Sequence, residues 1–198
     1  MNYIEPVLLK ELHEADYDSL IRYRIRKILM ICSNYDAFIL EEDGQIESQI
    51  YREYIELNLS NSPKFVWVTT SEEARAVMNS SNDIDLVISM FNMGDLEVFQ
   101  LASDLKEQGK NIPFVLLTHF SKEVYKRLSL QNTSGIDYMF SWHGNADLIL
   151  AIVKLLEDRI NADHDILEVG VQAILLVEDS VRYYSTYLPE LYKLILKQ

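Results

Sequence analysis

The chain has 198 residues, of which 48% are hydrophobic and 25% charged, and its formal net charge at pH 7 is −13. This composition is typical of a soluble globular protein with its own core. The strong negative charge argues against nucleic-acid binding and against adhesion to anionic membranes. Cys32 is the single cysteine, so an internal disulfide and a cysteine-based metal cluster are excluded. The N-terminus is acidic and no long apolar span occurs, so we expect a cytoplasmic protein.

The first part of the chain predicts a helical leader at residues 1–26, followed by a short buried strand at 28–31. A helical stripe comes next, formed by Ile46, Ile50, Tyr54 and Leu57. Residues 65–69 are aromatic or β-branched and predict a second strand. Thr70 and Glu73 then have the spacing of a capping box, which predicts a helix around residues 72–78.

The same alternation of apolar runs and amphipathic stretches continues to residue 160. It predicts strands at 86–90, 113–118 and 135–142, and helices at 96–107, 121–130 and 145–160. The last helix has a predicted buried stripe of Leu148, Ile152, Leu155, Leu156 and Ile160. Five strands alternating with five helices predict an α/β fold, a doubly wound parallel sheet in the order 2-1-3-4-5 with helices on both faces.

Several of these segments resemble a response-regulator receiver domain, which is CheY-like and flavodoxin-like. Residues 85–90 (Asp-Leu-Val-Ile-Ser-Met) are similar to the family's third strand, and 113–118 (Pro-Phe-Val-Leu-Leu-Thr) to its fourth. Residues 135–142 are similar to the fifth strand and the turn after it. The resemblance covers about residues 27–161, and it implies a signalling module. It also implies a pairing surface, because receivers often pair through the face that residues 122–160 would form in this chain.

The resemblance implies that the phosphorylation site is degenerate. Met90 stands at the phosphoacceptor position, and Cys32 and Ser33 stand where an acidic pair would hold Mg²⁺. Ser141, or Trp142 if the register is shifted by one residue, stands at the position of the lysine, and only Thr118 keeps the family's residue type. We therefore expect no catalytic residue, no cofactor and no Mg²⁺ in residues 27–161. A nearby acid such as Asp36 is a weak substitute, and the Thr118 hydroxyl is expected to bond to a loop.

The C-terminal part of the sequence resembles the start of a second receiver-like unit. After a predicted linker at 162–172, residues 173–177 (Ala-Ile-Leu-Leu-Val) are similar to a receiver's opening strand. Glu178 and Asp179 then fall where the metal-binding acidic pair belongs, and a helical pattern follows. This predicts a truncated second receiver-like unit at 173–198. Its strand must find a sheet edge, on its own domain or on another copy.

Three hypotheses of function follow from these patterns. The leading one is a regulatory or protein-interaction module of a multidomain bacterial signalling protein, which accepts no phosphate. The second is the N-terminal regulatory region of a phosphoenolpyruvate synthase-like phosphotransferase, which the order of leader and receiver-like units resembles. The third is a small-ligand sensor, in which the emptied pocket of Cys32, Ser33, Met90, Thr118 and Ser141 binds a neutral or apolar molecule. The expected partners are proteins or downstream domains, with a homodimer through helix faces or the C-terminal strand as an alternative.

Overall fold

The computed structural model of this chain describes residues 22–33, 46–57, 61–91, 97–119, 128–144 and 146–197, together with residues 59, 124 and 126. Most of the predicted leader lies outside them, and so does Asp36.

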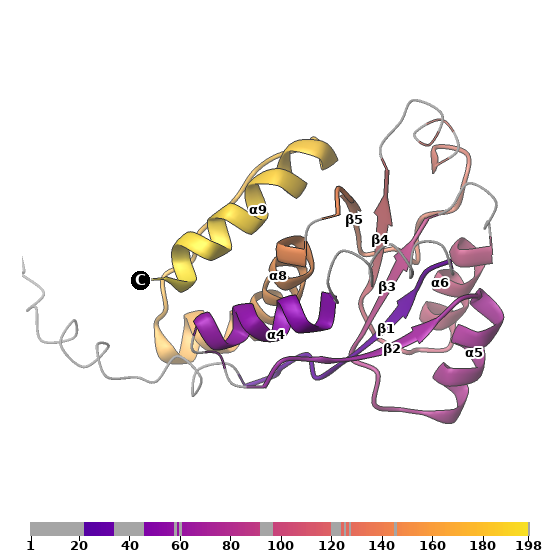
Figure 1. Cartoon of the computed structure of the whole chain (residues 1–198), viewed down its shortest axis with the longest axis horizontal. Coiled ribbons are helices and arrows are strands. Elements are labelled where there is room, and N and C mark those ends of the chain that lie inside the picture. The colour runs from indigo at the N-terminus through magenta and orange to yellow at the C-terminus, as the bar shows by residue number, and fades with distance from the viewer. Residues whose placement is uncertain are drawn as a thin grey trace, which may run out of the picture.

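A sheet of five parallel strands organises the molecule, in the order β2-β1-β3-β4-β5 (Figure 1). This order confirms the predicted fold class. The strands are β1 (Lys27–Ile31), β2 (Lys64–Val68), β3 (Leu86–Met90), β4 (Phe114–Thr118) and β5 (Tyr138–Ser141). Side chains of the inner strands are buried on both faces, because helices cover both sides of a parallel sheet.

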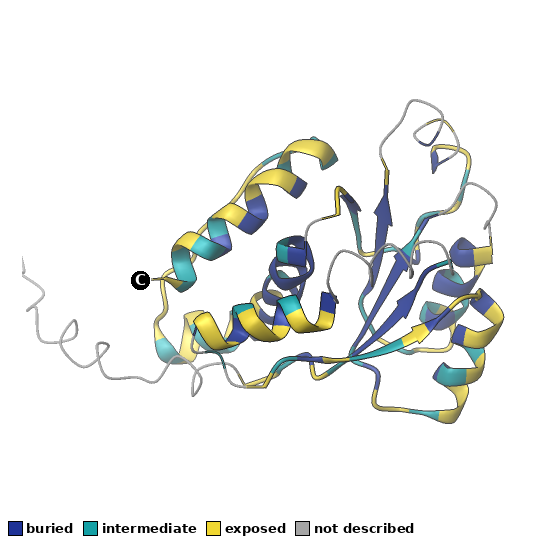
Figure 2. Cartoon of the chain, in the orientation of Figure 1, coloured by how far each residue is buried: buried dark blue, intermediate teal, exposed yellow. Residues whose placement is uncertain are grey.

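Two apolar clusters lie on the two faces of the sheet. One contains residues of α4 (Ile46–Glu56), α8 (Ala146–His164) and α9 (Val181–Leu196), packed against alternate strand residues such as Ile88. The other contains residues of α5 (Ser71–Ser80) and α6 (Glu97–Glu107), packed against the intervening residues such as Val87. Figure 2 shows the buried sheet between the two layers of helices.

Local signals in the sequence set several boundaries. The Thr70 hydroxyl accepts a hydrogen bond from the Glu73 N–H at 3.1 Å, so the predicted N-cap of α5 is confirmed. Gly109 ends α6 with a φ of 72°, a conformation that favours glycine. Gly135 lies against α6, where an added Cβ would come within 2.4 Å of the Ala102 carbonyl carbon. A side chain there would push the segment before β5 away from α6.

Helix α8 extends beyond its predicted end. It continues to His164, and a π-helical turn, η1 (Asp165–Val169), follows it, so much of the predicted linker is helical. Ile160 was predicted to be buried but is 48% exposed. Glu157 and Asn161 face inward instead, because the Glu157 carboxylate accepts from the Ile25 N–H and the Asn161 amide bonds to the Tyr23 backbone.

The C-terminal strand predicted at residues 173–177 is not formed. Residues 171–179 have no regular secondary structure, and α9 follows them. A strand requires a neighbouring strand as hydrogen-bonding partner, and α9 already occupies the outer edge of β5, where such a strand would add (Figure 1). The division of the chain into domains stays a prediction. No helix in the described ranges is long and apolar enough to cross a membrane.

Candidate functional site

The carboxyl ends of parallel strands meet at one edge of the sheet, which is where open α/β folds form their sites. The residues singled out by the sequence meet there. Met90, Thr118 and Ser141 end β3, β4 and β5, and the register places Thr118 beside Ser141. Cys32 follows β1, with its N–H donating to the Val68 carbonyl at 3.1 Å. The sheet therefore brings four of the five predicted pocket residues to one edge, and Ser33 is next in the chain.

This edge carries sulfur and hydroxyl groups at the positions discussed. Cys32 and Ser141 are buried, whereas Met90 is half-buried and packs against the cluster that contains α8. The Ser141 hydroxyl lies 3.0 Å from the His143 Nε2 atom. A thioether cannot form an acyl phosphate, and neither a thiol nor a hydroxyl supplies the charged oxygen ligands that Mg²⁺ prefers. Among the described residues, no group of three His, Cys, Asp or Glu side chains could hold a metal ion.

No residue that the structure describes supplies the loop hydrogen bond expected for the Thr118 hydroxyl. Its Oγ1 atom is buried and has no partner among the described residues, and the same is true of the Ser89 Oγ atom one strand away. Side chains alternate along a strand, so Thr118 points the same way as Leu116, into the apolar cluster below α5 and α6. A buried hydroxyl without a partner costs roughly 1–3 kcal/mol. The described part of the fold offers no hydrogen bond that would offset the cost of burying these two hydroxyls.

Glu178 and Asp179 do not stand at the end of a strand, because residues 173–177 form none. The Glu178 carboxylate accepts from the Ser180 N–H at 2.9 Å, immediately before α9 begins. Asp179 is exposed. Their proposed role as a metal-binding pair stays a prediction.

Helix α9 covers the outer edge of β5, a contact that the sequence interpretation missed. The Ser141 N–H donates to the Ser185 hydroxyl at 2.8 Å, and the Met139 N–H donates to the Tyr184 hydroxyl. Burial is the main cause that raises the pKa of Tyr184, so this hydroxyl stays protonated. The apolar face of α9 was recognised in the sequence, but the helix was assigned to a separate, second receiver-like unit.

Further contacts hold α9 against α8. Tyr192 is buried, and its hydroxyl donates to the Asp158 carboxylate at 2.6 Å. Lys193 forms an ion pair with Asp147 at 2.6 Å, and the hydrogen bond to this carboxylate raises the pKa of Lys193. The face around residues 122–160, through which the resemblance implies pairing, is thus partly occupied by the chain's own helix.

Comparisons with known proteins bear on the fold. The receiver domain of the Francisella response regulator 1452 is 20% identical over 68% of this chain and 98% of that one, with a TM-score of 0.47. The response regulator TrrA from Thermotoga maritima, solved with Mg²⁺-BeF, is 21% identical over 66% and 98%, with a TM-score of 0.48. An adenylate cyclase structure from Rhodopirellula baltica is 12% identical over 74% and 98%, with a TM-score of 0.49. No family model and no curated protein matches the chain. The fold assignment rests on the strand order and the covered faces of the sheet.

Proposed function

We propose that residues 27–161 form a cytoplasmic, receiver-like regulatory module that acts through protein contacts and accepts no phosphate. One observation carries this proposal. The carboxyl ends of β1, β3 and β5 present Cys32 with Ser33, Met90 and Ser141, at the positions where the resemblance implies three carboxylates and a lysine.

The chemistry of these side chains supports the proposal. Phosphoryl transfer to a protein carboxylate requires the carboxylate itself and a cation that offsets the charge of the incoming group. Met90 provides no nucleophilic oxygen. Ser141 provides no positive charge, and its backbone N–H is already bonded to Ser185. The module is then left with its helix faces and sheet edges as functional surfaces.

The test is incubation of the whole chain with acetyl phosphate and Mg²⁺, followed by mass spectrometry, with beryllofluoride titration observed by amide NMR. We expect no adduct and no saturable shift near Met90 and Thr118. A hydroxylamine-sensitive adduct within residues 27–161 would overturn the proposal. Shifts confined to Glu178 and Asp179 would place the metal chemistry in the C-terminal segment and leave the proposal for residues 27–161 intact.

A second candidate function, binding of a small neutral ligand at the same edge, is favoured by the hydroxyls of Ser89 and Thr118, which have no partner in the part of the chain that the structure describes. A ligand that hydrogen-bonds to them would remove their desolvation cost. Thr118→Val replaces the hydroxyl by a methyl group of similar size, so we expect it to stabilise the free protein. A metabolite that raises the melting temperature of the wild type but not of T118V supports this function. If no nucleotide or metabolite shifts the melting temperature, the candidate fails.

The phosphoenolpyruvate synthase-like alternative stays an untested prediction.

A further inference from the structure

The segment between η1 and α9, residues 171–179, is called the strap below. Its centre is apolar and open to solvent: Ile174 is 67% exposed, Leu175 86% and Val177 82%. From Gln172 to Asp179 no backbone group forms a hydrogen bond with any residue that the structure describes. A continuous apolar run of this length is typical of a strand buried on both faces. The strap therefore has the sequence of a buried strand without a sheet.

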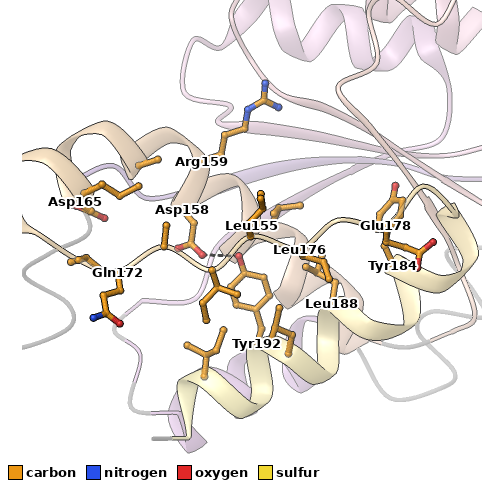
Figure 3. Close-up of a pocket in the computed structure, with 18 of the residues that line it drawn as sticks. Leu155, Asp158, Arg159, Asp165, Gln172, Leu176, Glu178, Tyr184, Leu188 and Tyr192 are labelled. Atoms are coloured by element: carbon orange, nitrogen blue, oxygen red, sulfur yellow. Dashed lines mark hydrogen bonds between the residues drawn. The ribbon is translucent and has the colours of Figure 1, made fainter.

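The strap's own domain covers it incompletely. Figure 3 shows the strap passing over α8 and α9, above a cavity of about 740 Å³ lined mainly by apolar side chains of the three segments. Leu176 is 42% exposed, less than its two neighbours, so its side chain turns toward the helices. Leu175 also borders this cavity, yet both Leu175 and Val177 remain largely exposed to solvent. Exposed apolar surface of this kind marks an interaction site.

The two edges of the sheet differ in their availability to such a segment. At β5, the Ser185 and Tyr184 hydroxyls already accept from the outward-facing N–H groups of Ser141 and Met139. Strand β2 forms the opposite edge. The strap lies with α9 on the β5 side of the sheet (Figure 1), so the β2 edge of its own copy is out of its reach.

The backbone of β2 offers bonding groups at its outer side. The Lys64 N–H donates to the Arg26 carbonyl, and the Val68 carbonyl accepts from Cys32, so these residues face β1. Backbone direction alternates along a strand, and Phe65 and Trp67 therefore turn their N–H and C=O groups outward. Their rings stack with centroids 5.8 Å apart, and Trp67 is 37% exposed. This edge is apolar and short, and its length of five residues equals that of the strap's centre.

We propose that the strap of one copy of this chain adds as an antiparallel strand to the β2 edge of a second copy. Ile174 then pairs with Trp67 and Leu176 with Phe65, so that the outward-facing groups of β2 find partners. This inference does not depend on whether the strand-end site accepts phosphate.

Charge selects the antiparallel direction. In this register Asp179 lies diagonal to Lys64 on one face of the sheet, within reach of the long lysine side chain. Lys64 is exposed and forms no ion pair with any residue in the described ranges. The parallel direction would instead bring Glu178 and Asp179 next to Thr69 and the Glu73 carboxylate. Hydrogen bonds from Thr69 lower the pKa of Glu73, so this carboxylate stays charged and would repel them.

Each copy carries one strap and one β2 edge, so the contact joins two different surfaces. Two such contacts close a dimer if they are reciprocal, and an open series of copies forms if they are not. In either case the fraction of chains that are associated rises with protein concentration.

Sedimentation velocity of the whole chain over a concentration series tests the proposal through a charge exchange. Lys64→Glu and Asp179→Lys each place like charges together, and we expect each to weaken association about fivefold. Both side chains are exposed, so neither change should affect folding. The double variant restores an opposite pair and should recover wild-type association. A wild type that is monomeric at every concentration overturns the proposal, and so does a double variant no better than the single ones.

A matched pair of proline variants tests the register. Leu176→Pro removes an N–H that bonds to β2 in the proposed pairing, whereas the Leu175 N–H points away from it. We expect L176P to weaken association at least tenfold and L175P to weaken it less. Amide hydrogen exchange at Phe65 and Trp67 should slow as concentration rises in the wild type but not in L176P. Equal effects of the two prolines, or exchange independent of concentration, would exclude this contact.

Discussion

The two edges of the sheet differ in how the backbone hydrogen-bonding groups of their outer strands are covered. At the β5 edge, hydroxyl groups of α9 accept the hydrogen bonds that a further strand would otherwise take, and Tyr184 packs against Phe140 with ring centroids 5.0 Å apart. At the β2 edge, α4 contributes the Glu47 carboxylate, which accepts from the Trp67 indole N–H at 2.7 Å, and no described residue bonds to the outward backbone groups of the strand. A helix can therefore close a parallel sheet edge when its hydroxyls are placed at the spacing of the strand. Without them the edge stays available to another chain.

The largest expected effect concerns the packing of α9 at the closed edge. Leu188 is 4% exposed within the cluster that contains α8, so Leu188→Ala should cost about 2–4 kcal/mol of unfolding free energy. Leu194, on the same helix, is 64% exposed, and Leu194→Ala should change it by less than about 0.5 kcal/mol. Urea denaturation followed by circular dichroism measures both. Equal small losses would show that α9 is not an integral part of this fold.

The hydrogen bonds that the α9 hydroxyls accept from β5 should contribute less to stability than this packing. Ser185→Ala leaves the Ser141 N–H without its acceptor in a buried position, at a cost of about 1–2 kcal/mol. Thr186→Ala is the matched control, because the Thr186 hydroxyl bonds only within the exposed side of the helix, to the Arg182 carbonyl. Amide exchange at Ser141 should accelerate in S185A alone. Unchanged exchange there would mean that α9 does not protect the edge.

A side-chain contact at the open edge should contribute less again. Glu47→Ala removes the acceptor of the Trp67 indole, but water can replace it at this exposed position, so we expect a loss of about 0.5 kcal/mol. Fluorescence-monitored urea denaturation gives the value. A loss as large as that of S185A would contradict the contrast between the two edges.

The smallest effect is a dependence on pH at the α8–α9 contact. Burial raises the pKa of Asp158, although the Tyr192 hydroxyl acts in the opposite direction. Its ionised form therefore destabilises the folded state above the raised pKa, and this cost disappears as the pH falls toward the ordinary value of the carboxyl group. Asp158→Asn should slightly raise the melting temperature at neutral pH, with a difference that vanishes toward pH 4. A difference that grows as the pH falls would show that the opposite sign applies.

Local chemistry was sufficient to predict most of the fold. The apolar runs at β1, β3 and β4 are unambiguous because strands covered on both faces need apolar side chains throughout. The cap at Thr70 depends only on neighbouring residues, and it was predicted. The gathering of Met90, Thr118 and Ser141 at one edge followed from the strand order.

The sequence predictions that failed concern residues whose partners lie far away in the chain. Residues 173–177 have the composition of a strand, but a strand forms only where an edge is free, and α9 occupies the nearer one. Glu157 and Asn161 are polar yet buried, because backbone groups at Tyr23 and Ile25 bond to them across more than a hundred residues of chain.

The sequence by itself determined the alternation of strands and helices, hence the sheet and the kinds of atom at its carboxyl edge, because periodicity and residue chemistry are local properties. Only the tertiary structure decided which edge α9 closes, which hydroxyls remain unpaired and that the strap lacks a sheet. Those outcomes depend on competition between segments for the same hydrogen-bonding groups, and such competition is settled only when the segments are in contact.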